Sequence, residues 1–268
     1  MKPKVCILRS DGTNCDEELF YAFEKFGSSP EYVHINELRA KSSPSGVLTK
    51  GGKNLSSYQI LALPGGFSYG DDIAAGKVLA IELTSFFKDE LQNFVAQKGI
   101  IVGICNGFQT LVRTGLLPFN NLGKMNVTLA LNESGHFECR WVKLKISDSK
   151  CLFFNGSDKS IEIAVNHGEG KFYTDGATLQ KIKNQNLVVF NYVDDSGRLT
   201  QAYPQNPNGS LEAIAGICDP SGRILGIMPH PEKFVEITQH PNWRRFDKNR
   251  KPDGAAFFEN MIKFANQS

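Results

Sequence analysis

The sequence predicts an α/β fold built around a doubly wound, largely parallel sheet, with additional antiparallel strands in the C-terminal half. Up to Arg113, short apolar runs rich in β-branched residues alternate with segments of helical periodicity. Runs such as residues 100–102 are apolar throughout, which is typical of parallel strands covered on both faces. Beyond Arg113, strand-like runs follow one another and are separated by turns such as residues 219–222.

The predicted elements of the N-terminal half follow a β-α-β order. A strand over residues 4–8 precedes a helix that ends near Phe26, with Thr13 or Asn14 as its N-cap and Gly27 as its stop. Further strands are predicted over residues 31–35, 59–63 and 100–102, and further helices over residues 85–97 and 108–113. Ligands bind such sheets at the carboxyl ends of the strands, so we expect the loops after the last two strands to share a crevice.

The C-terminal half is predicted to consist mainly of strands and to close with a helix. The strands cover residues 127–131, 137–146, 161–165, 187–193, 211–218 and 223–228, and the helix covers residues 254–265. No shift in composition divides the chain, so we expect one domain over residues 1–268. Within it, residues 233–253 form an extended basic tail segment, expected to be solvated, and residues 41–53 form an exposed loop that matches no motif.

Composition and charge exclude several classes of function. A net charge of +2 over 268 residues leaves no electrostatic footprint for nucleic acid. No run approaches the ~20 apolar residues of a transmembrane helix, and the first apolar run is too short for a signal peptide. The six cysteines lack Cys-x-x-Cys pairs and finger-like spacing, so we predict neither a metal site nor a disulfide framework. Reduced thiols in the cytoplasm are therefore expected.

A nucleophile is predicted at Cys105, because it lies between a strand and a helix in the pattern Gly103-x-Cys105-x-Gly107. This is the thiol counterpart of the nucleophile elbow, in which a strained turn raises the reactive side chain above the sheet and small neighbours are required. The N-terminus of the following helix favours the thiolate. A buried structural cysteine is the alternative interpretation, and the two glycines at this spacing favour the nucleophile.

A thiolate nucleophile needs an imidazole that a carboxylate orients, and His230 with Glu232 is the predicted pair. Both follow an apolar strand and flank Pro231, so their side chains point to the same side of a rigid turn. An exposed histidine beside an acid is the alternative. His167 is predicted to lie in a glycine-rich turn that forms a wall of the substrate site, and a turn at the surface is the alternative. Of the other histidines, His34 is expected in the core, and His136 and His240 at the surface.

An oxyanion hole needs two convergent N–H donors, and we predict Gly66 and Asn106 for this role. Gly66 belongs to the turn after strand 59–63, and Asn106 directly follows the predicted nucleophile. A tight turn without function is the alternative for the glycine. Residues 65–70 lack the Gly-Lys-Ser/Thr sequence of a phosphate-binding loop, and no nucleotide site is predicted in this chain.

Four motifs stand in the chain order of a known family: residues 64–71, 103–109, 167–170 and 229–232. Together they resemble the class I glutamine amidotransferases, and most closely the glutaminase subunits of phosphoribosylformylglycinamidine synthase. The resemblance implies a flavodoxin-like fold, with Cys105, His230 and Glu232 as the catalytic triad. It implies that Gly66 and Asn106 form the oxyanion hole. It also implies that Gln109 and the backbone of Asn166 and His167 hold the α-amino and carboxylate end of the glutamine.

The resemblance further implies the partners of the chain. The expected partner is the large synthetase subunit, which aminates formylglycinamide ribonucleotide with ATP and Mg²⁺ in purine biosynthesis. The resemblance does not decide whether a small third subunit joins the complex. No cofactor is expected in this chain itself. Two other interpretations remain: a stand-alone hydrolase with the same triad, of the γ-glutamyl hydrolase or peptidase type, and a non-enzymatic binding module.

Overall fold

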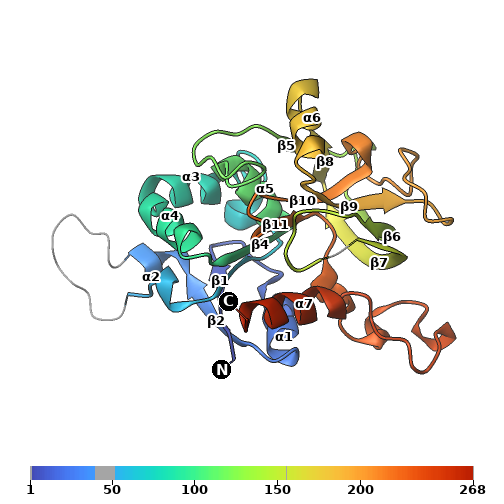
Figure 1. Ribbon diagram of the computed structural model, residues 1–268, viewed down its shortest axis with the longest axis horizontal. Coiled ribbons are helices and arrows are strands. Elements are labelled where there is room, and N and C mark those ends of the chain that lie inside the picture. The colour runs from blue at the N-terminus through green and yellow to red at the C-terminus, as the bar shows by residue number, and fades with distance from the viewer. Residues whose placement is uncertain (1, 40–51, 155, 268) are drawn as a thin grey trace.

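A nine-stranded mixed sheet runs through the centre of the molecule, in the order β2-β1-β3-β4-β11-β10-β9-β6-β7 (Figure 1). The computed structural model describes residues 2–39, 52–154 and 156–267. The strands are β1 (Lys4–Arg9), β2 (Ser29–His34), β3 (Ile60–Leu63), β4 (Ile100–Ile104), β6 (Glu138–Ile146), β7 (Ser157–His167), β9 (Val188–Val193), β10 (Ile214–Cys218) and β11 (Ile224–Ile227). A separate two-stranded sheet pairs β5 (Thr128–Leu131) with β8 (Glu169–Tyr173).

The large sheet is parallel in one half and antiparallel in the other. Strands β2, β1, β3, β4 and β11 pair in parallel, and β10, β9, β6 and β7 continue the sheet in antiparallel pairs. Every residue of β3, β4 and β11 is buried, because helices cover both faces there. This confirms the predicted doubly wound, largely parallel sheet with antiparallel additions.

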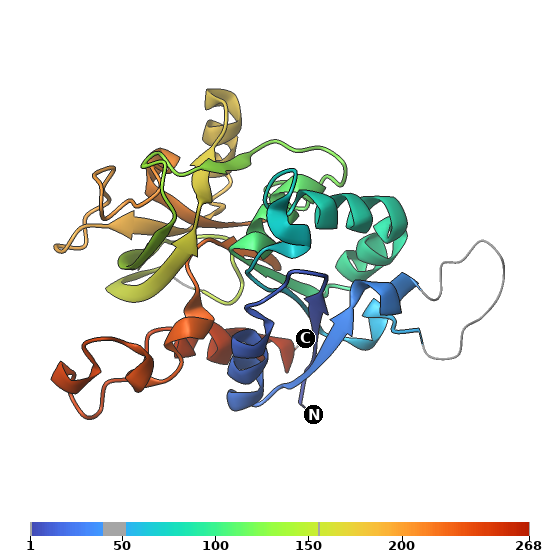
Figure 2. The same cartoon turned by 180° about the vertical axis from the view of Figure 1, so that it is seen from behind.

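Helices cover both faces of the parallel half, with α3, α4 and α5 on one side and α1 and α7 on the other (Figures 1 and 2). The helices are α1 (Asp16–Lys25), α2 (Ile35–Arg39), α3 (Lys77–Phe86), α4 (Lys88–Ala96), α5 (Asn106–Thr114), α6 (Gly176–Asn184) and α7 (Ala255–Ala265). Phe23 of α1 meets Phe258 of α7 edge to face, with ring centroids 5.1 Å apart, which joins the two helices on their shared face.

Two predicted helix features are wrong. The helix predicted over residues 85–97 is the end of α3 followed by α4, and Phe87 separates the two with non-helical φ and ψ of −124° and 19°. Its ring is fully buried, so core packing decides the break. At the start of α1 the N-cap is Cys15 rather than Thr13 or Asn14, and it makes no side-chain cap. The Thr13 hydroxyl instead accepts a hydrogen bond from the Ser10 N–H at 3.1 Å.

Strand β8, helices α2 and α6, and most of α3 are absent from the prediction. Strand β8 begins within residues 167–170, which the sequence predicts to form a glycine-rich turn, and α6 has only nine residues. The Asp175 carboxylate accepts a hydrogen bond from the Thr178 N–H at 2.9 Å, which caps α6 and is a signal that the sequence contains. Most of the predicted loop over residues 41–53 lies outside the described residues.

The tail segment, residues 233–253, is only partly solvated. Arg244 and Arg245 are exposed, as predicted, but His240 is buried. Its ring lies 4.2 Å from that of Trp141 and 4.7 Å from that of Phe246, so aromatic packing holds the segment against β6. The expectation of a surface position for His240 is therefore wrong. His34 is half-buried rather than in the core, and His136 is exposed as predicted.

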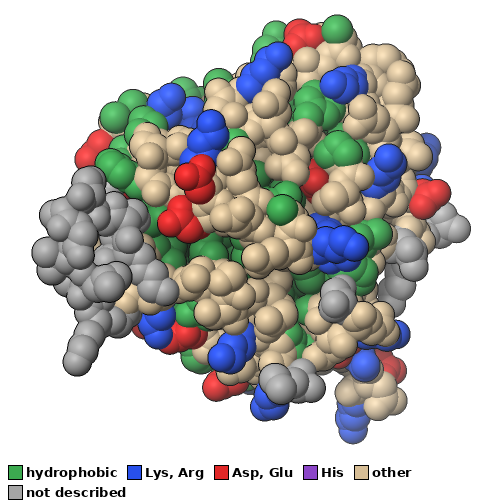
Figure 3. Space-filling view, turned by 60° about the vertical axis from the view of Figure 1, so that its left-hand side comes forward, with side chains coloured by type: hydrophobic (Ala, Val, Ile, Leu, Met, Phe, Trp, Pro, Cys, Tyr) green, Lys and Arg blue, Asp and Glu red, His purple; other side chains and the backbone are tan. Residues whose placement is uncertain are grey.

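The surface of the described residues carries mixed charge. On the face that Figure 3 shows, basic and acidic side chains are scattered among one another, in keeping with the net charge of +2. Within the part of the chain that the structure describes, no helix is both long and apolar enough to cross a membrane. All six cysteines are free thiols.

Candidate active site

Cys105 lies in the sharp turn between β4 and α5 with φ of 52° and ψ of −106°, a conformation that residues with a Cβ rarely adopt. Its N–H donates to the Ile227 carbonyl at 2.8 Å, which holds the turn against β11. A Cβ on Gly103 would lie 2.5 Å from the Gly107 carbonyl oxygen, and one on Gly107 would lie 2.1 Å from that of Leu63. Both positions therefore require glycine, as an elbow predicts.

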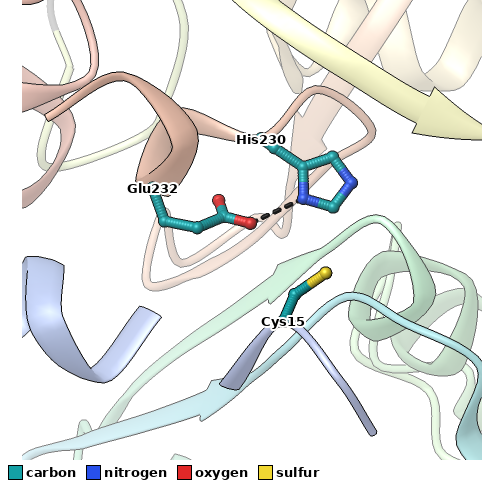
Figure 4. A group of neighbouring side chains, drawn as sticks. All are labelled: Cys15, His230 and Glu232. Carbon is teal, nitrogen blue, oxygen red and sulfur yellow. Dashed lines mark hydrogen bonds and ion pairs between the residues drawn. The ribbon is translucent and has the colours of Figure 1, made fainter. Parts of the chain in front are cut away.

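His230 and Glu232 form a buried pair at the end of β11. The backbone N–H of His230 donates to the Ala164 carbonyl at 2.8 Å, and this bond holds in place the backbone that carries the ring. Nδ1 of His230 lies 2.6 Å from Oε1 of Glu232, and each side chain is 1% exposed (Figure 4). Burial alone lowers the pKa of His230, but the charges of Glu232 and Cys105 outweigh it and raise that pKa well above its usual range.

Cys105 and His230 meet across Gly65, although they are far apart in the sequence. A Cβ on Gly65 would lie 2.6 Å from Cε1 of His230 and 3.3 Å from Cβ of Cys105, so both side chains pack against one point of the backbone. Both also line one cavity of about 490 Å³. The structure therefore brings together the three side chains predicted for the triad. They follow the carboxyl ends of β4 and β11, which are adjacent and parallel.

Substitution of Gly65 by alanine tests this contact. The new methyl group would overlap the His230 ring and push it away from Cys105 while leaving both predicted catalytic side chains in the protein. We expect turnover of the substrate to fall by about 10²-fold, the usual loss for a displacement of about 1 Å. Steady-state kinetics measure this loss, and a thermal melt checks that the fold remains. Unchanged turnover in a folded variant would contradict the close contact.

The predicted oxyanion donors lie on segments that side chains tie together. Gly66 has φ of +122°, and a Cβ there would lie 2.2 Å from Oδ1 of Asn14, so a larger residue does not fit. Asn106 is buried; its Oδ1 accepts from the Ser68 hydroxyl at 2.6 Å, and its Nδ2 donates to Asp71 at 2.8 Å. These bonds hold the loop after β3 against the start of α5, and the oxyanion role of the two N–H groups stays a prediction.

The three residues predicted to hold the substrate line the same cavity. Nε2 of Gln109 donates to the Glu169 carbonyl at 2.5 Å, and the Asn166 carbonyl accepts from the Cys105 thiol at 3.6 Å. His167 is buried, with Nδ1 3.1 Å from Oδ1 of Asn132. Burial, together with the nearby His230, lowers the pKa of His167 to about 3, so its ring is neutral near pH 7. Their substrate contacts stay predictions.

Sequence reasoning missed Cys15. It directly precedes α1, and its N–H donates to the Gly65 carbonyl at 3.3 Å, which places the thiol beside the His230–Glu232 pair (Figure 4). Donor atoms of the three side chains lie within 4.8 Å of one another. Its position after β1, at the same edge of the sheet as the loops after β3 and β4, was the available signal.

Comparison with known proteins identifies the family. The sequence matches the CobB/CobQ-like glutamine amidotransferase domain over residues 2–265. The chain belongs to this family of glutamine amidotransferases. The resemblance to class I glutamine amidotransferases inferred from four motifs is thereby confirmed.

Relatives of this glutamine amidotransferase match it along almost its whole length. Phosphoribosylformylglycinamidine synthase subunit PurQ of Dehalococcoides mccartyi is 46% identical over 267 residues, which cover 99% of each chain. The PurQ subunit of Methanococcus maripaludis strain C7 is 37% identical over 278 residues, or 99% of this chain and 98% of that one. A chain in the solved structure of PurLQS from Thermotoga maritima is 31% identical, with a TM-score of 0.72. The match covers 98% of this chain and 99% of that one.

Proposed function

We propose that the chain is the glutaminase subunit of a phosphoribosylformylglycinamidine synthase, which releases ammonia from glutamine and passes it to a separate synthetase subunit. The observation that carries the proposal is the cavity in which Cys105 meets the His230–Glu232 pair, in a chain 46% identical to a PurQ subunit over 99% of both. The full-length match favours the subunit over a stand-alone hydrolase, and the assembled triad favours an enzyme over a binding module.

The first step is attack of the Cys105 thiolate on the side-chain amide carbon of glutamine. The negative charge that develops on the amide oxygen is stabilised by the N–H groups of Gly66 and Asn106. The raised pKa of His230 keeps its ring protonated beside the thiolate, and Glu232 holds the ring in place through Nδ1. Neutral His167 and the polar atoms of Gln109 and Asn166 hold the amino-acid end of the substrate.

The second step releases ammonia and then glutamate. Protonated His230 donates to the leaving nitrogen, the C–N bond breaks, and a γ-glutamyl thioester with Cys105 remains. His230, now neutral, takes a proton from water, whose oxygen attacks the thioester carbon. The C–S bond breaks, glutamate leaves, and thiolate and imidazolium are restored. None of these steps draws on a cofactor.

The ammonia has to reach its acceptor without entering solvent, where it would become ammonium. Large apolar side chains lie exposed around the cavity mouth: Phe67 is 46%, Phe137 53% and Leu131 71% exposed. A rim of this kind suits docking of a partner protein. The partner is the synthetase subunit, which holds ATP and Mg²⁺ and aminates formylglycinamide ribonucleotide in the cytoplasm.

Glutamate release from glutamine tests the proposal. The chain is assayed alone and with the synthetase subunit, ATP, Mg²⁺ and formylglycinamide ribonucleotide. We expect slow hydrolysis alone and a severalfold faster rate in the complex, coupled to formation of the amidine product. Rapid cleavage of γ-glutamyl peptides by the isolated chain, unchanged by the partner, would support the stand-alone hydrolase instead.

A further inference from the structure

Cys15, His230 and Glu232 form a set of metal-ligating side chains that the proposed reaction uses only in part. They come from the loop before α1 and the turn after β11, and all three are buried. One donor atom from each lies within 4.8 Å of the other two. Figure 4 shows the Cys15 sulfur pointing toward the imidazole, whose Nδ1 faces the carboxylate.

One donor atom of this set lacks a hydrogen-bond partner. Among the described residues, Oε2 of Glu232 is buried and accepts no hydrogen bond. The Cys15 thiol has a long contact of 4.0 Å to Oδ1 of Asn14, and it also interacts with the His230 ring. Buried donors and acceptors are nearly always satisfied, so an unsatisfied carboxylate oxygen beside a thiol and an imidazole indicates a site that can take a ligand.

We propose that Cys15, Nδ1 of His230 and Glu232 bind a thiophilic divalent cation of the Zn²⁺ type, and that this cation inhibits the enzyme. Thiolate, imidazole and carboxylate are the three ligand types that Zn²⁺ takes, at about 2.3, 2.0–2.1 and 2.0–2.2 Å. The donors lie within 4.8 Å of one another, so binding requires the Cys15 and Glu232 side chains to rotate until each donor reaches such a distance. Cys15 and His230 line the cavity, so a water molecule from it supplies the fourth ligand.

Binding displaces two protons, one from the Cys15 thiol and one from Nδ1 of His230. The thiolate and the carboxylate then neutralise the two positive charges of the metal, and the imidazole ligand is neutral. Because Nδ1 holds the metal, the remaining ring proton stays on Nε2, and His230 can no longer accept a proton there. The inhibition rests on the proposed function, whereas the binding does not.

Co²⁺ titration of the full chain tests the binding without any assay of activity, because a cobalt–thiolate bond gives a charge-transfer absorption band. We expect one equivalent of Co²⁺ to produce the band, and Zn²⁺ to displace it. Cys15→Ser should abolish the band, whereas Cys105→Ser and the matched control Cys139→Ser, which removes an exposed thiol, should keep it. Loss of the band in Cys105→Ser but not in Cys15→Ser would overturn the assignment, as would no band in the unaltered chain.

Inhibition is measured as each variant's rate with Zn²⁺ relative to its own rate without it. We expect Cys15→Ser to raise the half-inhibiting Zn²⁺ concentration by at least about 10- to 100-fold, because loss of a direct ligand costs no less than the loss of an outer-shell partner. Glu232→Gln, which leaves Cys15 in place, should weaken Co²⁺ binding, and it serves if the Cys15 variant does not fold. Equal sensitivity of Cys15→Ser and the unaltered chain would refute the inhibitory site. A chain that binds Co²⁺ through Cys15 yet never hydrolyses glutamine would refute the proposed function alone.

Discussion

Replacement of Cys105 by alanine is expected to abolish synthesis of the amidine product from glutamine while synthesis from added ammonia continues. The thiolate is the only group proposed to form a bond with the substrate, and no other thiol occupies the elbow between β4 and α5. Loss of a nucleophile lowers turnover by about 10⁴- to 10⁶-fold. Ammonia bypasses this step, because the amination takes place on the synthetase subunit.

The comparison of the two nitrogen sources is made on the assembled complex. Product formation with glutamine and with ammonium salt is measured side by side, and co-purification shows whether the variant still binds its partner. Cys6→Ala is a matched control, since it removes a buried thiol of β1 and should retain both activities. Equal loss of the two activities in Cys105→Ala, with the complex intact, would contradict the division of roles between the subunits.

Substitution of Glu232 by glutamine is expected to lower kcat for glutamine hydrolysis by about 10²- to 10⁴-fold with a smaller effect on KM. Glutamine keeps the size of the side chain but removes the charge that lies 2.6 Å from Nδ1 of His230. That charge is the main factor that raises the pKa of His230, so its removal lowers the pKa. Protonated His230 is then lost at a lower pH, and the alkaline limb of kcat/KM shifts to lower pH.

The pH profile distinguishes this electrostatic role from a purely structural one. A change in packing alone would reduce activity at every pH and leave the alkaline limb where it is. Glu236→Gln is the matched control, because Glu236 pairs with Lys25 at the surface and lies outside the cavity. A KM effect larger than the kcat effect, or an unshifted alkaline limb, would contradict the role of Glu232 as the group that orients and charges His230.

Much of the fold could be predicted because its signals are local. Apolar runs such as those of β3 and β4 are fully buried strands, and the glycines around Cys105 report a turn that leaves no room for a Cβ. The break at Phe87 could not be predicted, because both sides of it have helical propensity and burial of the ring decides the matter. Helix α6 was missed although Asp175 caps it, since its apolar face is short.

The histidines also differ in how well the sequence predicts their surroundings. The prolines on either side of His230 indicated a rigid turn, and the ring lies against its carboxylate as expected. His240 lies in the segment predicted to be a solvated basic tail, yet it is buried by Trp141 and Phe246. Trp141 belongs to β6, and Phe246 lies further along the tail segment. No local sequence pattern predicts that these rings pack against His240.

The elbow at Cys105, the rigid turn at His230 and the alternation of strands and helices follow from the amino-acid sequence alone, because backbone sterics and periodicity act over a few neighbouring residues. Which loops meet depends on contacts between distant parts of the chain. The parallel pairing of β4 with β11 places Cys105 beside His230, and the loop after β1 brings Cys15 to the same place. These contacts depend on strand order in a sheet, and strand order is set by packing over the whole chain.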